Sequence, residues 1–220
     1  MKKYLFLVLI PFLFCSCNAE SPYHQNTKIK EHDFFRDIPV FEQDSLVNIV
    51  VEIPAGCNQK WEVHKETGYL QWEEVRKDSL RVVKYLPYPA NYGMIPRTFL
   101  PLEDGGDNDP LDVFLLGPAL KRGTVVPGRI VGVLFMKDNE EQDDKLIAVQ
   151  VDSWFYNVFS MDDLQKQFPG VVDILAHWLT NYKRSGNVEL MGFGNETKAQ
   201  KILHKAIQGF EKKHLRLSDR

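Results

Sequence analysis

The order of local patterns constrains this chain most, because strand-like segments come first and helix-like segments follow. Six short segments are rich in β-branched residues or alternate charge with bulk, as half-buried strands do: 46–53, 60–65, 80–83, 112–116, 129–136 and 145–151. Short strands at this spacing favour a closed or nearly closed sheet. Apolar residues then recur at helical spacing over 171–184, and Asn195 can cap a second helix. We therefore predict an α+β protein with helices packed on a barrel.

The composition is that of a globular domain and excludes several function classes. The 220 residues are 44% hydrophobic and 26% charged, which excludes a disordered, collagenous or multi-span membrane chain. The formal net charge is -3, so no basic excess indicates a nucleic acid partner. The three cysteines cannot form a disulfide framework.

The first residues predict an export signal. Lys2 and Lys3 precede an apolar stretch over 4–14, which is shorter than the roughly 20 residues that span a bilayer. The stretch ends in Cys-Ser-Cys at 15–17, which resembles a bacterial lipoprotein signal with Cys17 as the lipidated residue. The alternative is an ordinary signal peptide cleaved nearby.

These patterns divide the chain into three parts. We expect residues 1–16 to be a signal peptide, 17–30 a polar tether and 31–220 the folded domain. The protein would then be exported and tethered to the membrane, facing the periplasm or the exterior. If the signal interpretation is wrong, the protein is cytoplasmic.

Acidic residues are concentrated in two short segments. Residues 103–112 and 138–144 each contain five acids and no base. Carboxylates this close raise one another's pKa unless a cation neutralises them. Asp107, Asp109 and Asp112 stand on a turn stiffened by proline and lead into an apolar strand, an arrangement that suits Mg²⁺. For the second segment alone, a solvated loop is an equal alternative.

Other cation sites fit the pattern less well. An EF-hand beginning at Asp107 would need glycine where Asp112 stands and glutamate where Pro118 stands. Zinc is disfavoured because no Cys or His is near these acids. We expect His177, His204 and His214, which lack metal-like spacing, to be structural or surface residues.

Bases and phenols elsewhere in the chain complement the acids. A single Lys or Arg is usually solvated surface, but together with metal carboxylates such groups can bind a multiply charged phosphate. The candidates beside probable strands are Lys60, Arg81, Lys145 and the pair Tyr182 and Lys183, and a predicted turn at 88–93 adds Tyr88 and Tyr92.

Six motifs, in the same order, resemble those of the soluble family I inorganic pyrophosphatases. The most specific is GDNDPLDV at 106–113, which is similar to the family's D-x-D-P-x-D-V signature. The others are VEIP at 51–54, KWE at 60–62, YPANYG at 88–93, the D-x4-D-x-K spacing at 138–145 and YK at 182–183. The motifs lie within roughly residues 45 to 210, and the spacing between Gly68 and Tyr88 resembles the eukaryotic-type branch.

The resemblance implies a fold and a reaction. The fold would be a five-stranded OB-like β-barrel with flanking helices, and the reaction Mg²⁺-dependent hydrolysis of pyrophosphate to two phosphates without a covalent intermediate. Asp109 would be the general base acting on a metal-bridged water. The eukaryotic-type spacing favours a homodimer.

The resemblance also implies a role for each matching side chain. Asp107, Asp112 and Asp143 would hold the first metal, and Asp112 also the second. Asp138 and Asp143 would hold a third metal, and Glu52 would lie near a further one. The phosphates would be bound by Lys60, Arg81, Tyr92, Lys145, Tyr182 and Lys183, with Glu62 and Tyr88 in support. Arg76 is the alternative to Arg81, because it is also in range of the matching position.

One position departs from the family pattern. Asn139 follows Asp138 where the family often has a second acid, which leaves the occupancy of the third metal site open. Two other functions remain as alternatives: a barrel that binds anions and metals without turnover, and a phosphohydrolase for nucleotides or polyphosphate. The presence of Asp109 favours the pyrophosphatase, since a protein without turnover has little reason to keep the base.

Overall fold

The structure, a computed structural model, describes residues 27–43, 45–77, 79–183 and 186–218. The predicted signal peptide, the predicted lipidation site Cys17 and most of the predicted tether lie outside these ranges. The last tether residues form β1 (Lys28–Ile29), which pairs antiparallel with β5 (Leu70–Trp72). Residues 28–29, which were predicted to belong to the tether, are therefore part of the folded structure.

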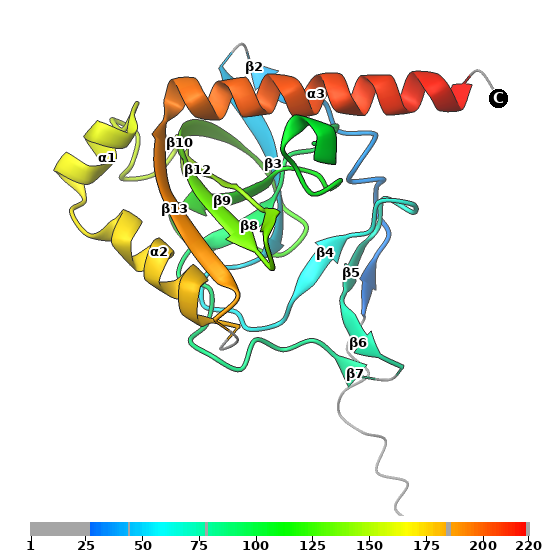
Figure 1. The fold of residues 1–220 in the computed structure, drawn as a ribbon, viewed down its shortest axis with the longest axis horizontal. Helices are drawn as coiled ribbons and strands as arrows, with labels where there is room; N and C mark the ends of the chain where they lie inside the picture. The colour runs from blue at the N-terminus through cyan, green and yellow to red at the C-terminus, as the bar shows by residue number, and fades with distance from the viewer. Residues whose placement is uncertain (1–26, 44, 78, 184–185, 219–220) are drawn as a thin grey trace, which may run out of the picture.

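One large sheet dominates the fold (Figure 1). Its strands lie in the order β11-β10-β12-β9-β8-β3-β2, and β13 also pairs with β10. Their bounds are β2 (Phe41–Gln43), β3 (Leu46–Ile53), β8 (Asn91–Met94), β9 (Asp112–Leu116), β10 (Val125–Asp138), β11 (Glu141–Gln142), β12 (Lys145–Gln150) and β13 (Val188–Asn195). Strand β3, with the sequence LVNIVVEI, is the richest in β-branched residues, which suit a buried pleated sheet.

The long strand β10 closes this sheet on itself. Its first residues pair with β3, and its later residues pair with β12. Five strands, β3, β8, β9, β12 and β10, thereby form a ring, as the OB-like prediction requires. A register shift between Ile130 and Gly132 bends β10, and bulges of this kind allow a sheet to curve. The ring is not a clean barrel, because β2, β11 and β13 extend it.

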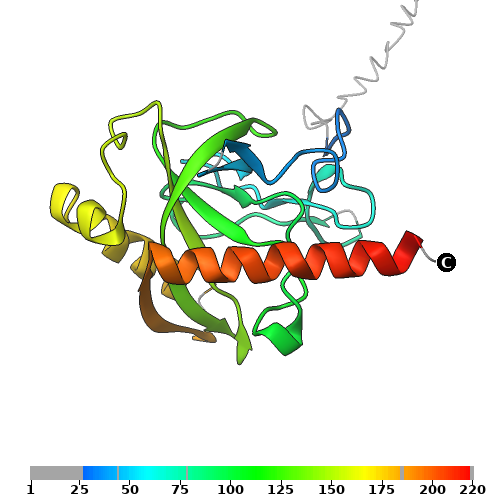
Figure 2. The same ribbon diagram turned by 90° about the horizontal axis from the view of Figure 1, so that it is seen from above.

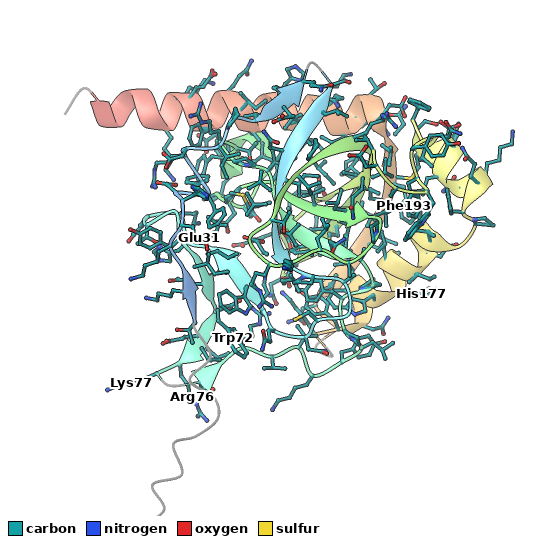
Figure 3. The ribbon with its side chains drawn as sticks, turned by 180° about the vertical axis from the view of Figure 1, so that it is seen from behind. Glu31, Trp72, Arg76, Lys77, His177 and Phe193 are labelled. Carbon is teal, nitrogen blue, oxygen red and sulfur yellow. The ribbon has the colours of Figure 1, made fainter. Side chains whose placement is uncertain are left out.

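Smaller strands flank the ring. Strands β1, β5 and β4 (Trp61–Val63) form a three-stranded sheet, and β6 (Glu74–Arg76) pairs with β7 (Ser79–Leu80) in a separate ribbon. Arg76 projects from this ribbon, away from the body of the protein (Figure 3). A short 3-10 helix, η1 (Leu102–Asp104), precedes β9.

Three α-helices cover the ring on two sides. Helices α1 (Met161–Gln167) and α2 (Val171–Asn181) pack on one group of buried residues, which includes Tyr88 and Tyr92. The long helix α3 (Glu196–Ser218) crosses the sheet on another side (Figure 2). Its small buried residues Ala199 and Ala206 allow a close approach to the sheet.

The predicted elements are largely confirmed. The structure begins β3 and β9 at the predicted residues, α2 ends at Asn181 rather than at 184, and α3 follows Asn195. The strand predicted at 80–83 is reduced to β7 at Ser79–Leu80, and helix α1 and strands β1, β2, β5, β6, β11 and β13 were not predicted. The interpretation of 88–93 as a turn was wrong for its second half, which forms β8. Gly93 is required there because a Cβ would lie 1.8 Å from the Val50 carbonyl oxygen.

Candidate active site

One cavity of about 490 Å³ brings together nearly all of the predicted site residues. It is lined by Lys60, Arg81, Tyr88, Tyr92, Asp107, Asp109, Asp112, Asp138, Asn139, Glu141, Asp143, Lys145, Trp178, Leu179, Tyr182 and Lys183. The two exceptions, Glu52 and Glu62, line a neighbouring cavity of about 360 Å³. We call these the main cavity and the side cavity. Lys60, Asp109 and Asp112 line both, so all of the predicted residues belong to one connected region.

The direction of two strands places an acid beside a base in the main cavity. Strands β9 and β12 are parallel neighbours and begin at the same edge, with Asp112 and Lys145 as their first residues. The Lys145 ammonium donates to Asp112 Oδ2 at 2.5 Å and also to Asp143 Oδ1. The Lys145 side chain is only 5% exposed, so both contacts are shielded from water.

The opposite charges of Lys145 and its two aspartate partners stabilise one another. Burial by itself would lower the pKa of Lys145, but Asp112 and Asp143 outweigh that effect and raise it. Burial would raise the pKa of Asp112, but Lys145 and Lys60 reverse the effect and lower it. Lys145 is therefore an ammonium and Asp112 a carboxylate at neutral pH.

A tight turn holds Asp107 and Asp109. The Asp109 backbone N–H donates to Asp107 Oδ1 at 3.0 Å, and Asn108 between them has a left-handed φ of 62°. Asp109 is also fixed by its backbone pairing with Leu100. Its carboxylate forms an ion pair with Lys65 and stays accessible, with 46% of its side chain exposed.

Two acids are held in surroundings that disfavour their charge. Burial, followed by repulsion from Asp112, raises the pKa of Asp107 to about 7. Burial raises the pKa of Glu52 to about 8, although Lys60 acts in the opposite direction. Glu52 accepts a 2.6 Å hydrogen bond from the backbone N–H of Val63. Both side chains would gain from a nearby cation.

The C-terminal end of α2 supplies the Tyr-Lys pair. Tyr182 stacks on Trp178 with the ring centroids 4.6 Å apart, and the Trp178 indole donates to the Leu86 carbonyl at 2.9 Å. Burial raises the pKa of Tyr182, so its phenol remains a hydrogen-bond donor. Lys183 forms an ion pair with Asp138.

A hairpin positions Arg81. Its guanidinium binds both carboxylate oxygens of Glu73, at 2.7 and 2.9 Å, and its carbonyl accepts a hydrogen bond from the Trp72 indole. Sequence reasoning missed Glu73, because the partner of Arg81 depends on how the hairpin pairs. It also missed Trp178 as a cavity residue, assigning it only to a helical stripe.

Tyr88, Tyr92 and Lys60 also line the main cavity. Burial raises the pKa of Tyr88 and of Tyr92, so both remain protonated. Lys60 Nζ lies 5.4 Å from the centre of the Tyr92 ring. Burial alone would lower the pKa of Lys60, but Tyr88, Asp112 and Glu52 raise it.

The predicted surface role of the histidines fits the described side chains. His177 lies on the outer side of α2 (Figure 3), and His204 is exposed on α3. Neither lines the main cavity. The side chain of His214 lies outside the described part of the chain.

The donor set of the main cavity suits a hard divalent cation. Five aspartates and one glutamate line it, and their carboxylate oxygens are the ligands that Mg²⁺ and Ca²⁺ prefer. The raised pKa values of Asp107 and Glu52 show that local positive charge would be favourable. Over the ranges that the structure describes, no three Asp, Glu, His or Cys side chains already converge as a metal-ligand group. Lysine ammonium groups lie against Asp112, Asp138 and Asp143 instead.

The raised pKa values predict that metal binding releases protons. A ligating carboxylate must be ionised, and Asp107 and Glu52 are partly protonated at pH 7. We expect release of roughly one proton per chain on Mg²⁺ binding at pH 7, and weaker binding at pH 6 than at pH 8. Calorimetry in two buffers with different ionisation enthalpies measures this release. Equal heats in both buffers would contradict it, and Asp107→Asn should reduce the number of protons released.

The fold and the cavity together define a metal-dependent enzyme that acts on phosphate groups. Carboxylates for cations face lysines, an arginine and phenols that suit a multiply charged phosphate, all on an OB-like ring of strands.

Comparison with known proteins gives the family. The family model for inorganic pyrophosphatase matches residues 49–211. An inorganic pyrophosphatase of Helicobacter pylori is 36% identical over 177 residues, which cover 77% of this chain and 94% of the relative. The structure of inorganic pyrophosphatase from Schistosoma japonicum has a TM-score of 0.76 at 28% identity and covers 81% of this chain and 71% of that chain. A Helicobacter pylori pyrophosphatase structure has a TM-score of 0.67 at 35% identity, covering 80% of this chain and 99% of that chain. The chain belongs to the inorganic pyrophosphatase family.

Proposed function

We propose that this chain hydrolyses inorganic pyrophosphate to two phosphates in the main cavity, with divalent cations, foremost Mg²⁺, held by its carboxylates. The observation that carries the proposal is the convergence of the family's motifs, which lie far apart in the sequence, on the main cavity and the side cavity beside it. The acids come from the loop before β9 and from the β10–β12 region. The bases and phenols come from the segment before β4, from the ends of β7 and α2, from β8 and from β12.

The resemblance to the family's motifs divides the carboxylates into groups. Asp107, Asp112 and Asp143 would hold one cation, with Asp112 shared by a second. Asp138 with Asp143 would hold a third, and Glu52, which lines the side cavity, would lie near a further one. The bound cations would supply positive charge that lowers the pKa of the attacking water and offsets the charge of the leaving phosphate.

Asp109 is the proposed general base. Its carboxylate is the accessible one of the 107–109 turn and borders both cavities, so it can reach a water beside the bound cations. It takes the proton of the water as the new P–O bond forms and the bridging P–O bond breaks.

The bases and phenols would hold the substrate. Lys60, Arg81, Lys145 and Lys183 carry positive charge to the phosphate oxygens, and Arg can bind two oxygens at once. The phenols of Tyr92 and Tyr182 stay protonated and donate hydrogen bonds. Glu62 and Tyr88 would support the side chains that bind the substrate. Burial is the main cause that raises the pKa of Glu62.

A phosphate-release assay tests the proposal. With Mg²⁺ present, the chain lacking residues 1–17 should release phosphate from pyrophosphate much faster than from ATP or tripolyphosphate. A chain that binds pyrophosphate without releasing phosphate would instead be a binding protein. A chain that prefers ATP or tripolyphosphate would be a different phosphohydrolase.

We further propose that the enzyme is exported and tethered through a lipidated Cys17. The support is the short apolar stretch that ends in Cys-Ser-Cys at 15–17. In the described part of the chain, no helix is long and apolar enough to cross a membrane. Cys17→Ser should move the protein from the membrane fraction to the aqueous fraction. Unchanged fractionation would contradict the tether.

We also propose that the chain belongs to the eukaryotic-type branch of the family and forms a homodimer. The long spacing between Gly68 and Tyr88, which holds the β6–β7 ribbon, supports the eukaryotic-type branch and with it a homodimer. Sedimentation of the purified chain measures the assembly directly.

A further inference from the structure

A tight turn aligns a further acid with Asp138. Strands β10 and β11 are joined by Asn139 and Glu140, which have φ values of 51° and 70°. Two positive φ values in a two-residue connection are typical of a type I′ hairpin. The register pairs Asp138 with Glu141, so the two side chains lie on the same face of the ribbon. Both line the main cavity.

The polar residues next to Glu141 do not offer a free carboxylate to the main cavity. The Asn139 amide donates to Asp138 Oδ1 at 3.1 Å, and its oxygen accepts from Asn187 at 2.6 Å. Glu140 lines a separate hollow with Asn187. The Gln142 amide is bound to a carboxylate outside the main cavity.

Glu141 also differs from the other carboxylates of this corner in its contacts. Asp138 pairs with Lys183, and Asp143 pairs with Lys145. Among the residues that the structure describes, the Glu141 carboxylate has neither a hydrogen-bond nor an ion-pair partner, although its backbone belongs to the β10–β11 pairing. An exposed carboxylate that is free of lysine and borders the main cavity is available to a cation there.

We propose that Glu141 joins Asp138 and Asp143 in holding the third cation, and so supplies the negative charge that Asn139 lacks. This inference rests on the proposed function. Mg²⁺ commonly keeps several waters and uses one or two carboxylates directly, so Glu141 can act by direct contact or through a cation-bound water. In either case it strengthens the binding of the cation that accompanies the substrate.

A matched pair of variants tests the proposal. Glu141→Gln and Glu140→Gln remove the same charge from adjacent positions, but only Glu141 borders the main cavity. Binding of Mn²⁺ is measured from the electron spin resonance signal of the free ion, with imidodiphosphate in place of pyrophosphate. We expect Glu141→Gln to lower the affinity for the most weakly bound Mn²⁺ about tenfold. We expect Glu140→Gln to change this affinity by about twofold or less.

A second variant shows whether the effect is local. Asn139→Asp returns an acid to the same corner, and Asp tolerates a left-handed φ. Added to Glu141→Gln, it should recover most of the lost affinity. Equal Mn²⁺ binding by the Glu141→Gln and Glu140→Gln proteins would overturn this inference while leaving the proposed function intact. Failure of the unaltered protein to release phosphate from pyrophosphate would instead overturn the proposed function.

Discussion

Asp109→Asn is expected to bind divalent cations with nearly unchanged affinity and to lose roughly 10²- to 10⁴-fold in turnover number. The amide has the size of the carboxylate, and the turn does not depend on the acid, because the hydrogen bond to Asp107 comes from the Asp109 backbone N–H. An amide cannot take a proton from water, so the chemical step loses its base. Phosphate release at saturating Mg²⁺ and pyrophosphate measures the turnover, and calorimetry measures cation binding.

A control variant distinguishes the loss of the base from the loss of its ion pair with Lys65. Lys65 contacts the Asp109 carboxylate and the Asn108 carbonyl, with 43% of its side chain exposed. Lys65→Met removes this contact and keeps the base, so we expect turnover within about threefold of the unaltered protein, as is usual for an exposed pair. Near-normal turnover by Asp109→Asn would show that another group accepts the proton.

Much of the fold could be predicted from local pattern. β-branched residues marked β3, and the apolar run after Asp112 marked β9. Closure of the ring could not be predicted, because it depends on Val125–Gly128 pairing with Val47–Val50, and residues this far apart leave no local signal. Helix α1 had a signal that went unused: Ser160 accepts a hydrogen bond from the Asp163 backbone N–H, as a helix cap does.

The candidate site was accessible from sequence for a different reason. Apart from Arg81, its residues occur in short motifs with fixed spacing, and the structure brings all of them to the main and side cavities. The contacts that position those residues were not accessible. Glu73 holds Arg81 only because β6 and β7 form a hairpin, and Glu141 faces the cavity only because a two-residue turn places it opposite Asp138. Motif spacing identifies the residues that act on substrate, whereas strand register selects their supporting partners.

Asp112→Asn should have the larger effect on cation binding. Asp112 begins β9, shares the Lys145 ammonium with Asp143, and is close enough to Asp107 to raise the pKa of that carboxyl. It is the proposed ligand shared by two cations. We expect the variant to lose the tightest cation site and to hydrolyse pyrophosphate about 10³-fold more slowly or worse, since cations contribute several kcal/mol to such reactions.

The same change has a structural cost that must be measured separately. Lys145 is buried and would keep only Asp143 as a charged partner, which we expect to lower the free energy of unfolding by about 1–3 kcal/mol. Asp104→Asn is the matched control, because Asp104 is exposed in the same acidic segment and lines neither cavity. If Asp112→Asn remains folded and binds Mg²⁺ as Asp104→Asn does, Asp112 is not a metal ligand. A folded Asp112→Asn protein without tight cation binding, beside an Asp109→Asn protein that retains it, would assign ligand and base to different carboxylates of one turn.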